Sequence, residues 1–324
     1  MNLQIAGMGC CLPERLVTTE ELALDRGLDP ALVRKLSGVD QRHWVTHESA
    51  PSMAAVAARE ALENAKTDWG DLDLVINASG TPWQVLPDGS ALLQKEFGQG
   101  HPGFSIHSTC VSFLSALQVA GALLKSGSHQ RILITSSEIC SKALNFEQPD
   151  SAFLFGDGAV AAVIKTAPPG SSSEMIKMAF ETHPEGSELA EIRGGGSRCH
   201  PANSKTIPED NMFHMKGASL LKIALQHLPP FLEKLQPGLS SGTGDIDRFF
   251  PHQASQKGKE LLIRLGWPSH KMESTLSKTG NLVAASVPMA LYQAIKENRL
   301  HRGDKIVLFA TGAGFSLGGI ILRY

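Results

Sequence analysis

The stretch GDLDLVINASG at residues 70–80 decides the fold, because its pattern recurs as GDIDRFFPHQA at residues 244–254. The offset is 244 − 70 = 174 residues. RILITSSE from Arg131 resembles KIVLFATG from Lys305 at the same offset, since 305 − 131 = 174. Two matches at one offset indicate a duplicated unit, although any two α/β units share some strand and helix spacing.

The positions of turn-forming and helix-ending residues along the chain predict strands that alternate with helices. A helix over about Met53 to Ala65 precedes the strand DLVINAS, and a helix after Cys110 ends at KSG before the strand RILITSS. This alternation predicts a parallel or mixed sheet with helical crossovers. We expect two halves, residues 1–168 and 169–324, with an insertion between APPGSSSE and HPANSKTIPEDN.

The composition is that of an ordinary globular protein. The 324 residues are 42% hydrophobic and 19% charged, and the net charge of −2 gives no reason to expect a nucleic acid or an anionic membrane as a partner. We see no secretory signal and no apolar run long enough to span a bilayer, so we expect a cytoplasmic protein. The five cysteines lack CxxC spacing, and His43 and His47 have no partner at ligand spacing, so we expect no metal.

One cysteine stands out in FSIHSTCVSFLSALQVAGALLKSG, residues 104–127. At the first turn of a helix, free backbone N–H groups and the helix dipole would favour the thiolate of Cys110, which is nucleophilic toward a thioester. The alternative is a small, buried apolar residue. The repeat maps Cys110 to position 110 + 174 = 284, another loop that enters a helix. If these junctions meet, Cys110, His252 and Asn281 share a pocket; otherwise His252 is a core or capped histidine and Asn281 a turn residue.

Six motifs then occur in a family-specific order. They are GVDQRHWV, STCVSF, LFGDGAVAAVI, PHQAS, KTGNLVAASVP and the terminal GAGFSLGGIILRY. In order and separation this set resembles the ketoacyl-ACP synthase III family of the thiolase superfamily, over nearly the whole chain. The resemblance implies a thiolase-like fold, with two duplicated βαβ-type halves packed as a layered α/β/α/β/α sandwich.

The resemblance also implies a site and a reaction. Cys110 would be the acylated nucleophile, and His252 with Asn281 would stabilise the enolate from decarboxylation of a malonyl thioester. That enolate would attack the acyl group in a Claisen condensation. The backbone N–H groups of Cys110 and Ala313 would form the oxyanion hole, where Gly312 and Gly314 allow close approach. No cofactor is expected beyond acyl thioesters on acyl carrier protein or coenzyme A.

The chain departs from the family where coenzyme A binds. Leu32, Leu36 and Pro149 stand where the family has nucleotide-binding side chains, although Arg34, Lys35 and Arg42 lie nearby. Lys222 and Lys257 match positions at which the family docks the acidic carrier protein; the alternative is an ordinary solvated face. We therefore expect acyl carrier protein to be the better acyl donor.

The loop TPWQVLPDGSALLQ resembles the segment that closes the partner's acyl pocket, so we expect a homodimer with Leu86 in that role. Ser112, where glycine is usual, is a further expected pocket residue. Relatives that condense head to head use a glutamate from this loop, whereas this loop offers only Asp88. Two alternatives stay open: acyl transfer or non-decarboxylative condensation onto a β-ketoacyl or other acceptor, and a catalytically inactive subunit.

Overall fold

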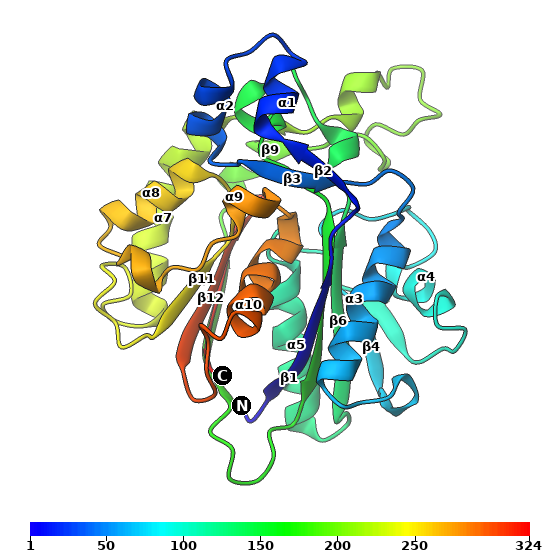
Figure 1. The fold of residues 1–324 in the computed structure, drawn as a ribbon, viewed down its shortest axis with the longest axis vertical. Coiled ribbons are helices and arrows are strands. Elements are labelled where there is room, and N and C mark those ends of the chain that lie inside the picture. Colours follow the sequence, from blue (N-terminus) through cyan, green and yellow to red (C-terminus); the bar gives the residue numbers. More distant parts are fainter.

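The computed structural model describes residues 1–324 and contains two main sheets (Figure 1). The first sheet has the order β1-β7-β6-β4-β5 and the second has the order β11-β12-β13-β8. The first sheet comprises β1 (Gln4–Cys11), β7 (Gly158–Lys165), β6 (Arg131–Glu138), β4 (Leu74–Asn77) and β5 (Gly103–Ser105). The second comprises β11 (Arg248–Pro251), β12 (Lys305–Gly312), β13 (Ser316–Arg323) and β8 (Glu174–Thr182). Both sheets are mixed, because parallel β4-β6 and β11-β12 pairs adjoin antiparallel ones.

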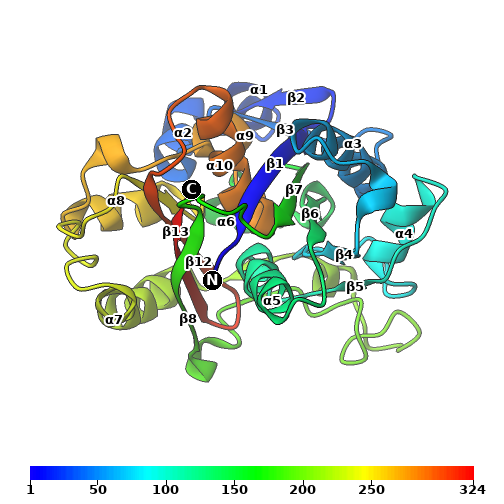
Figure 2. The same cartoon turned by 90° about the horizontal axis from the view of Figure 1, so that it is seen from below.

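The elements form five layers, which Figure 2 shows from below. Helices α5 (Ser112–Ser126) and α10 (Ser286–Lys296) lie between the two sheets. Helix α3 (Ala50–Asn64) covers the outer face of the first sheet, with α4 (Gly89–Lys95) beside it. On the second sheet the outer layer is α7 (Gly217–Leu235) and α8 (Gln256–Arg264). The layered α/β/α/β/α sandwich is therefore confirmed.

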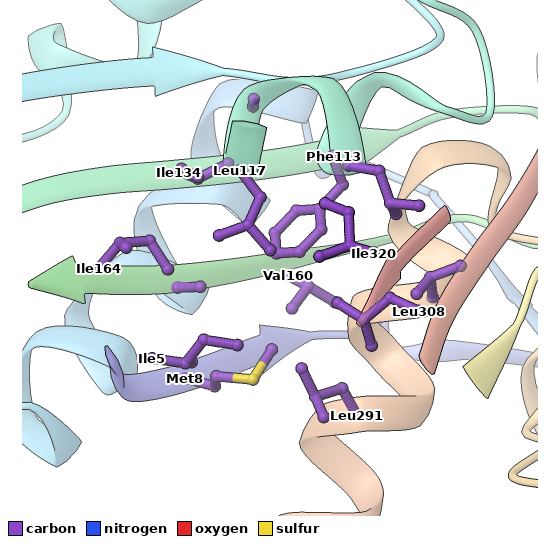
Figure 3. Close-up of a cluster of buried hydrophobic side chains, with 14 of the residues drawn as sticks. Ile5, Met8, Phe113, Leu117, Ile134, Val160, Ile164, Leu291, Leu308 and Ile320 are labelled. Carbon is purple, nitrogen blue, oxygen red and sulfur yellow. The ribbon is translucent and has the colours of Figure 1, made fainter. Parts of the chain in front are cut away.

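Strand alternation distributes the apolar side chains between the layers. On β6, Ile132 and Ile134 point to the middle layer, whereas Leu133 points to α3. On β12, Leu308 points to the middle layer and Val307 to α7 and α8. Successive strand residues face opposite sides, so a strand covered on both faces reads as a continuous apolar run. Figure 3 shows the largest core, the cluster of 35 buried residues around α5 and α10.

The predicted duplication is confirmed at the level of single residues. β4 and β11 begin at Leu74 and Arg248, and 248 − 74 = 174. β6 and β12 begin at Arg131 and Lys305, again 174 apart, and α5 and α10 begin at Ser112 and Ser286, where 286 − 112 = 174. The division at residue 168 remains our proposal, and it lies between β7 of the first sheet and β8 of the second.

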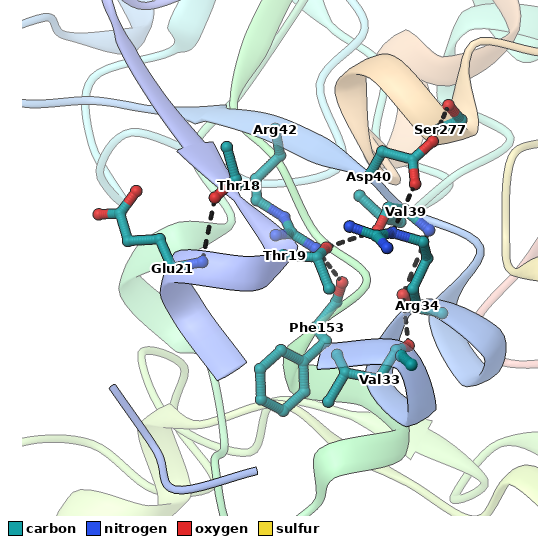
Figure 4. Close-up of polar contacts among 12 residues, drawn as sticks. Thr18, Thr19, Glu21, Val33, Arg34, Val39, Asp40, Arg42, Phe153 and Ser277 are labelled. Atoms are coloured by element: carbon teal, nitrogen blue, oxygen red, sulfur yellow. Dashed lines mark hydrogen bonds and ion pairs between the residues drawn. The ribbon is translucent and has the colours of Figure 1, made fainter. Parts of the chain in front are cut away.

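A smaller cap lies at the end of the sheets where the loops carry the candidate residues (Figure 1). It contains two short antiparallel strand pairs, β2 (Arg15–Thr18) with β3 (Gln41–Trp44), and β9 (Ala190–Glu191) with β10 (His214–Met215). The helices of this region are α1 (Thr19–Leu24), α2 (Pro30–Ser37), α6 (Pro149–Ala152) and α9 (Leu276–Thr279). In Figure 4, Asp40 pairs with Arg34 at 2.8 Å and accepts a hydrogen bond from Ser277 Oγ at 2.8 Å. The cap is thereby tied to the loop that leads to Asn281.

Two sequence expectations need adjustment. The helix predicted from Met53 begins three residues earlier, where the Ser49 and Ser52 side chains form a capping box. We expected no apolar run long enough to span a bilayer, but the 18 residues Thr109–Ser126 have that length and composition. Their helix lies in the middle layer, so the apolar sequence is explained by packing between two sheets.

Candidate active site

The candidate residues lie beside two turns that are equivalent in the repeat, and these turns lie close together. Thr109, just before Cys110, has φ = 49°, and Val283, just after Leu282, has φ = 48°. These positions are equivalent in the repeat, because 283 − 109 = 174. A positive φ is uncommon for Thr and Val, so each turn is a strained elbow held by its surroundings. The duplicated fold thus places Cys110 from one half near the loop of Asn281 from the other.

Both elbows open into a cavity of about 1100 Å³. Cys110, His252 and Asn281 all line this cavity, as does Ala313. The structure therefore brings together the three side chains that the motifs single out. Cys110 packs against a small buried cluster of Cys140, Leu144, Leu154, Phe155 and Val283.

Cys110 differs from expectation in two respects. Helix α5 begins at Ser112, so Cys110 lies two residues before the helix rather than in its first turn. Burial, and then the negative charge of Glu138, raise the pKa of the Cys110 thiol to about 12. The prediction of a favoured thiolate was wrong, because desolvation outweighs the nearby N–H groups.

The backbone N–H groups of Cys110 and Ala313 both point toward the Cys110 sulfur. Gly312, which precedes Ala313, fits closely here, because a Cβ at this position would lie 2.5 Å from Thr109 Oγ1. These two N–H groups are the expected oxyanion hole, and their arrangement fits that role. When an acyl group is bound to the sulfur, this arrangement would direct two N–H donors at the negative charge that develops on its carbonyl oxygen.

His252 follows β11 and is fixed through its backbone. Its N–H donates to the Phe309 carbonyl at 2.7 Å, and its own carbonyl accepts from Ala254 N at 2.9 Å. The residue is partly buried and lines the cavity, and its Nδ1 is buried without a hydrogen-bond partner. This burial lowers the pKa of His252 to about 4, so the imidazole is uncharged at neutral pH.

The amide of Asn281 is oriented by its own elbow. Oδ1 accepts hydrogen bonds from Val283 N at 2.8 Å and from Ser286 Oγ at 3.3 Å. Nδ2 lies 3.4 Å from the Ala254 carbonyl, which is a long and weak contact. Since the oxygen is occupied, the amide presents its N–H₂ donor, and the arrangement suits a second uncharged donor beside His252.

The two predicted pocket residues do not line the cavity within one chain. Ser112 is fully buried; its Oγ accepts from Ser108 N at 2.8 Å and donates to the Thr109 carbonyl at 2.6 Å. The Ser112 hydroxyl therefore holds the elbow rather than contacting an acyl group. Leu86 is 79% exposed in the single chain.

The residues at the cavity mouth indicate whether the site can bind the nucleotide of a coenzyme A donor. Leu36 and Asp150 line it, whereas Arg42 is buried and donates to the Phe153 carbonyl at 2.7 Å (Figure 4). Arg42 is therefore unable to replace a missing nucleotide contact, and Arg34 is paired with Asp40. Leu32 is exposed on α2, and Pro149 opens α6.

One of the two predicted docking lysines lines this cavity. Lys257 lies on α8 and lines it, whereas Lys222 is exposed on α7 between Leu221 and Ile223. Leu221 lines the cavity but Lys222 does not, so Lys257 is the cation at the entrance. The opening thus combines apolar and basic side chains.

One residue at the site was missed in the sequence. Glu138 ends β6, is fully buried and faces Cys110, whose thiol pKa it raises. Its place in the repeat is held by Gly312, since 312 − 138 = 174. An acidic residue at the end of a strand that is covered on both faces was the available signal.

Comparisons with known proteins agree with this geometry. Residues 104–184 match the family model for 3-oxoacyl-[acyl-carrier-protein] synthase III, and residues 240–324 match the model for its C-terminal part. A β-ketoacyl-[acyl-carrier-protein] synthase III of Paramagnetospirillum magneticum is 33% identical over 326 residues, which cover 99% of this chain and 98% of that protein. One from Vesicomyosocius okutanii is 31% identical, with the same coverage. The chain belongs to the 3-oxoacyl-[acyl-carrier-protein] synthase III family.

Members of this family are acyl-transferring condensing enzymes, and the fold comparison agrees with that class. The crystal structure of 3-oxoacyl-[acyl-carrier-protein] synthase III from Aquifex aeolicus has a TM-score of 0.87 and 29% identity, covering 99% of this chain and all of that one. OleA of Xanthomonas campestris also has a TM-score of 0.87, but at 19% identity it shows the fold alone. The synthase III assignment therefore rests on sequence and structure together.

Proposed function

We propose that this synthase III acylates Cys110 and then condenses the acyl group with the carbon unit of a malonyl thioester, giving a β-ketoacyl thioester. The observation that carries the proposal is the shared cavity of Cys110, His252 and Asn281, with two backbone N–H groups aimed at the sulfur. Fatty acid synthesis, or a related pathway built on the same condensation, would use this product.

In the first step the Cys110 sulfur forms a bond to the acyl carbonyl carbon, and the bond from that carbon to the donor's sulfur breaks. The thiol proton ends on the departing thiol, so the thioester is exchanged rather than hydrolysed. The N–H groups of Cys110 and Ala313 support the tetrahedral oxyanion. A thiol with a pKa near 12 needs its proton removed as the bond forms.

In the second step malonyl thioester loses carbon dioxide, and the electron pair moves to the thioester oxygen as an enolate. Two uncharged donors suit that oxygen, because they stabilise the developing charge without holding a counter-charge in the ground state. The low pKa of His252 and the fixed Oδ1 of Asn281 support these roles. The enolate carbon then attacks the acyl-Cys110 carbonyl and releases the Cys110 sulfur.

We propose acyl carrier protein as the preferred acyl donor. Lys257 at the mouth and the exposed Lys222 of α7 support docking of an acidic partner, which is electrostatic and salt-sensitive. At the nucleotide position the chain offers Leu36 and the negative charge of Asp150. Leu36 offers no polar contact, and the charge of Asp150 repels a coenzyme A phosphate. A carrier-bound pantetheine places no nucleotide there and is affected less.

A symmetric cytoplasmic homodimer completes the proposal. Strand β5 is the outermost strand of the first sheet, and all three of its residues are exposed, so its edge is free to pair with a second copy. The loop before α4 exposes several large apolar side chains, which such a pairing would cover. They are Trp83 at 48%, Val85 at 75% and Leu86 at 79%. In the dimer, Leu86 would close the partner's acyl pocket.

The head-to-head alternative has less support. The one acidic group of the loop is Asp88, and its Oδ1 accepts hydrogen bonds from Ser90 N at 2.8 Å and Ser90 Oγ at 2.5 Å. These bonds cap α4 and hold the carboxylate in a structural role. A base for non-decarboxylative condensation is therefore absent from that loop.

The test is to offer acyl carrier proteins with different chains, read the mass added to Cys110, and then add malonyl thioester. We expect an acyl adduct in the wild type, no adduct in Cys110→Ala, and carbon dioxide with a β-ketoacyl product after the second addition. A wild-type protein that acylates but never decarboxylates malonyl thioester would instead support the acyl-transfer alternative. A wild-type protein that never acylates would support an inactive subunit.

A further inference from the structure

Glu138 is a fully buried carboxylate with no cationic partner. No lysine, arginine or histidine forms an ion pair with it. Its oxygens instead accept hydrogen bonds from Gly80 N at 2.7 Å, Thr81 N at 2.8 Å and Thr81 Oγ1 at 2.6 Å. Charge-assisted bonds of this kind are short and strong, so the carboxylate holds the Gly80–Thr81 segment firmly.

That segment lies between the two elbows. A Cβ on Gly80 would lie 2.6 Å from Val283 Cγ1 and 3.0 Å from the Thr109 carbonyl, so the backbone is packed against both. Gly80 and Thr81 also line the cavity beside Cys110. Any displacement of this segment would shift the residues that flank Cys110 and Asn281.

The second half contributes a further donor. The backbone N–H of Ala284, in the turn after Asn281, also faces the Glu138 carboxylate. Ala284 is the repeat equivalent of Cys110, because 284 − 110 = 174. In the first elbow the N–H of Cys110 faces the reacting sulfur, whereas in the second the equivalent N–H faces a fixed carboxylate. Glu138 thus bonds to the Gly80–Thr81 segment of the first half and faces the Asn281 turn of the second.

We propose that Glu138 is a positioning residue that locks the Gly80–Thr81 segment and the Asn281 elbow in register. Its buried charge also opposes ionisation of the Cys110 thiol. The proposal rests on the proposed function for the identity of Cys110 as nucleophile. Cys110 and Cys140 are the titratable groups that feel this charge. Burial raises the pKa of Glu138 to about 7 despite its hydrogen bonds, so the charge itself titrates near neutrality.

The experiment measures the rate of Cys110 carbamidomethylation by iodoacetamide from pH 6 to 10, read by mass spectrometry on the Cys110 peptide. In the wild type we expect the rise with pH to flatten around pH 7, because ionisation of Glu138 there opposes thiolate formation. In Glu138→Gln the flattening disappears, and the rate at pH 8 rises several-fold, up to about tenfold for one pH unit of change in the thiol pKa. This readout requires no turnover, so it is separate from the test of the proposed function.

Two further variants complete the design. Thr81→Val keeps the carboxylate but removes the 2.6 Å hydrogen bond that favours its charged form, so we expect the flattening to move to higher pH and the condensation rate to fall. Ser136→Ala is the matched control, because it removes another buried bond of β6, from Ser136 Oγ to the Ala78 carbonyl at 2.6 Å, without contact to the cavity. It should change thermal stability alone. A Glu138→Gln profile that superimposes on the wild type would overturn the proposal, and if that variant fails to fold, full condensation activity in Thr81→Val would overturn it.

Discussion

His107 and Asn281 occupy equivalent positions in the two halves, since 281 − 107 = 174, and each faces an equivalent carbonyl. His107 Nε2 lies 3.2 Å from the Gly80 carbonyl, and Asn281 Nδ2 lies 3.4 Å from the Ala254 carbonyl, where 254 − 80 = 174. The same internal contact thus recurs with different side chains. Both residues line the cavity with His252, but Asn281 comes from the same half as His252 and His107 from the other.

This asymmetry gives a paired prediction. Asn281→Asp keeps the oxygen that accepts from Val283 N but loses the donor, so we expect decarboxylation to fall by about a hundredfold or more while Cys110 is still acylated. His107→Ala should change decarboxylation only a few-fold. Carbon dioxide release and acyl-enzyme mass, measured on the same samples, distinguish the two steps. Equal losses in both variants would contradict the assignment of the donor to Asn281.

The buried imidazole of His252 gives a pH prediction. Its pKa is lowered from 6.5 to about 4 in the folded state, so between these values the unfolded chain binds the extra proton. The contribution to stability is complete above pH 6.5 and is lost as the pH falls toward 4. It amounts to about 3 kcal/mol. Urea unfolding at pH 7 and pH 5 measures this loss.

The matched variant is His252→Asn. It removes the titrating ring, so its free energy of unfolding should fall less between pH 7 and pH 5 than that of the wild type. Decarboxylation by the wild type should persist down to about pH 5, because the ring stays neutral there. A wild-type activity that falls with a midpoint near 6.5 would show that the imidazole is solvated.

The docking surface is tested by charge reversal. Lys257→Glu should slow acylation from acyl carrier protein about tenfold at low salt and leave acylation from the matching coenzyme A thioester unchanged. Lys125→Glu, at the exposed end of α5, is the control for net charge. The effect of Lys257→Glu should shrink as salt is raised. Faster acylation by the coenzyme A thioester in the wild type would refute the preference for the carrier.

The dimer is tested at the edge strand. Phe104 is 38% exposed in the middle of β5, and Phe104→Asp should give a monomer by light scattering at micromolar concentration, with condensation activity largely lost. Leu24→Asp introduces the same change at an exposed leucine of the cap and should leave the mass unchanged. A wild-type protein that is monomeric and fully active would exclude the shared pocket.

Much of the fold was predictable because the same strand and helix pattern occurs twice in the sequence. The 174-residue offset holds to the residue between β4 and β6 and their counterparts β11 and β12, and the family-like motifs picked out Cys110, His252 and Asn281. Both signals are local: a strand pattern recurs, and a rare residue sits at a junction. The cavity residues follow from these junctions because the halves face one another.

The electrostatics of the site were not predictable in the same way. The pKa of Cys110 depends on burial and on Glu138, which lies 28 residues away in sequence, since 138 − 110 = 28. Ser112 was expected in the pocket because it stands where the family usually has glycine, yet its side chain points into the elbow. The direction of a side chain at an irregular turn is set by tertiary contacts, so it cannot be predicted from the spacing of residues in the sequence.

The shared middle layer has a consequence for folding. Helices α5 and α10 come from opposite halves, yet their apolar faces belong to one cluster of 35 residues. Neither half can bury its own face alone, so autonomous folding of one half would leave a large apolar surface in water. The chain should therefore unfold in a single cooperative transition, and a proteolytic nick between β7 and β8 should leave two fragments that stay associated.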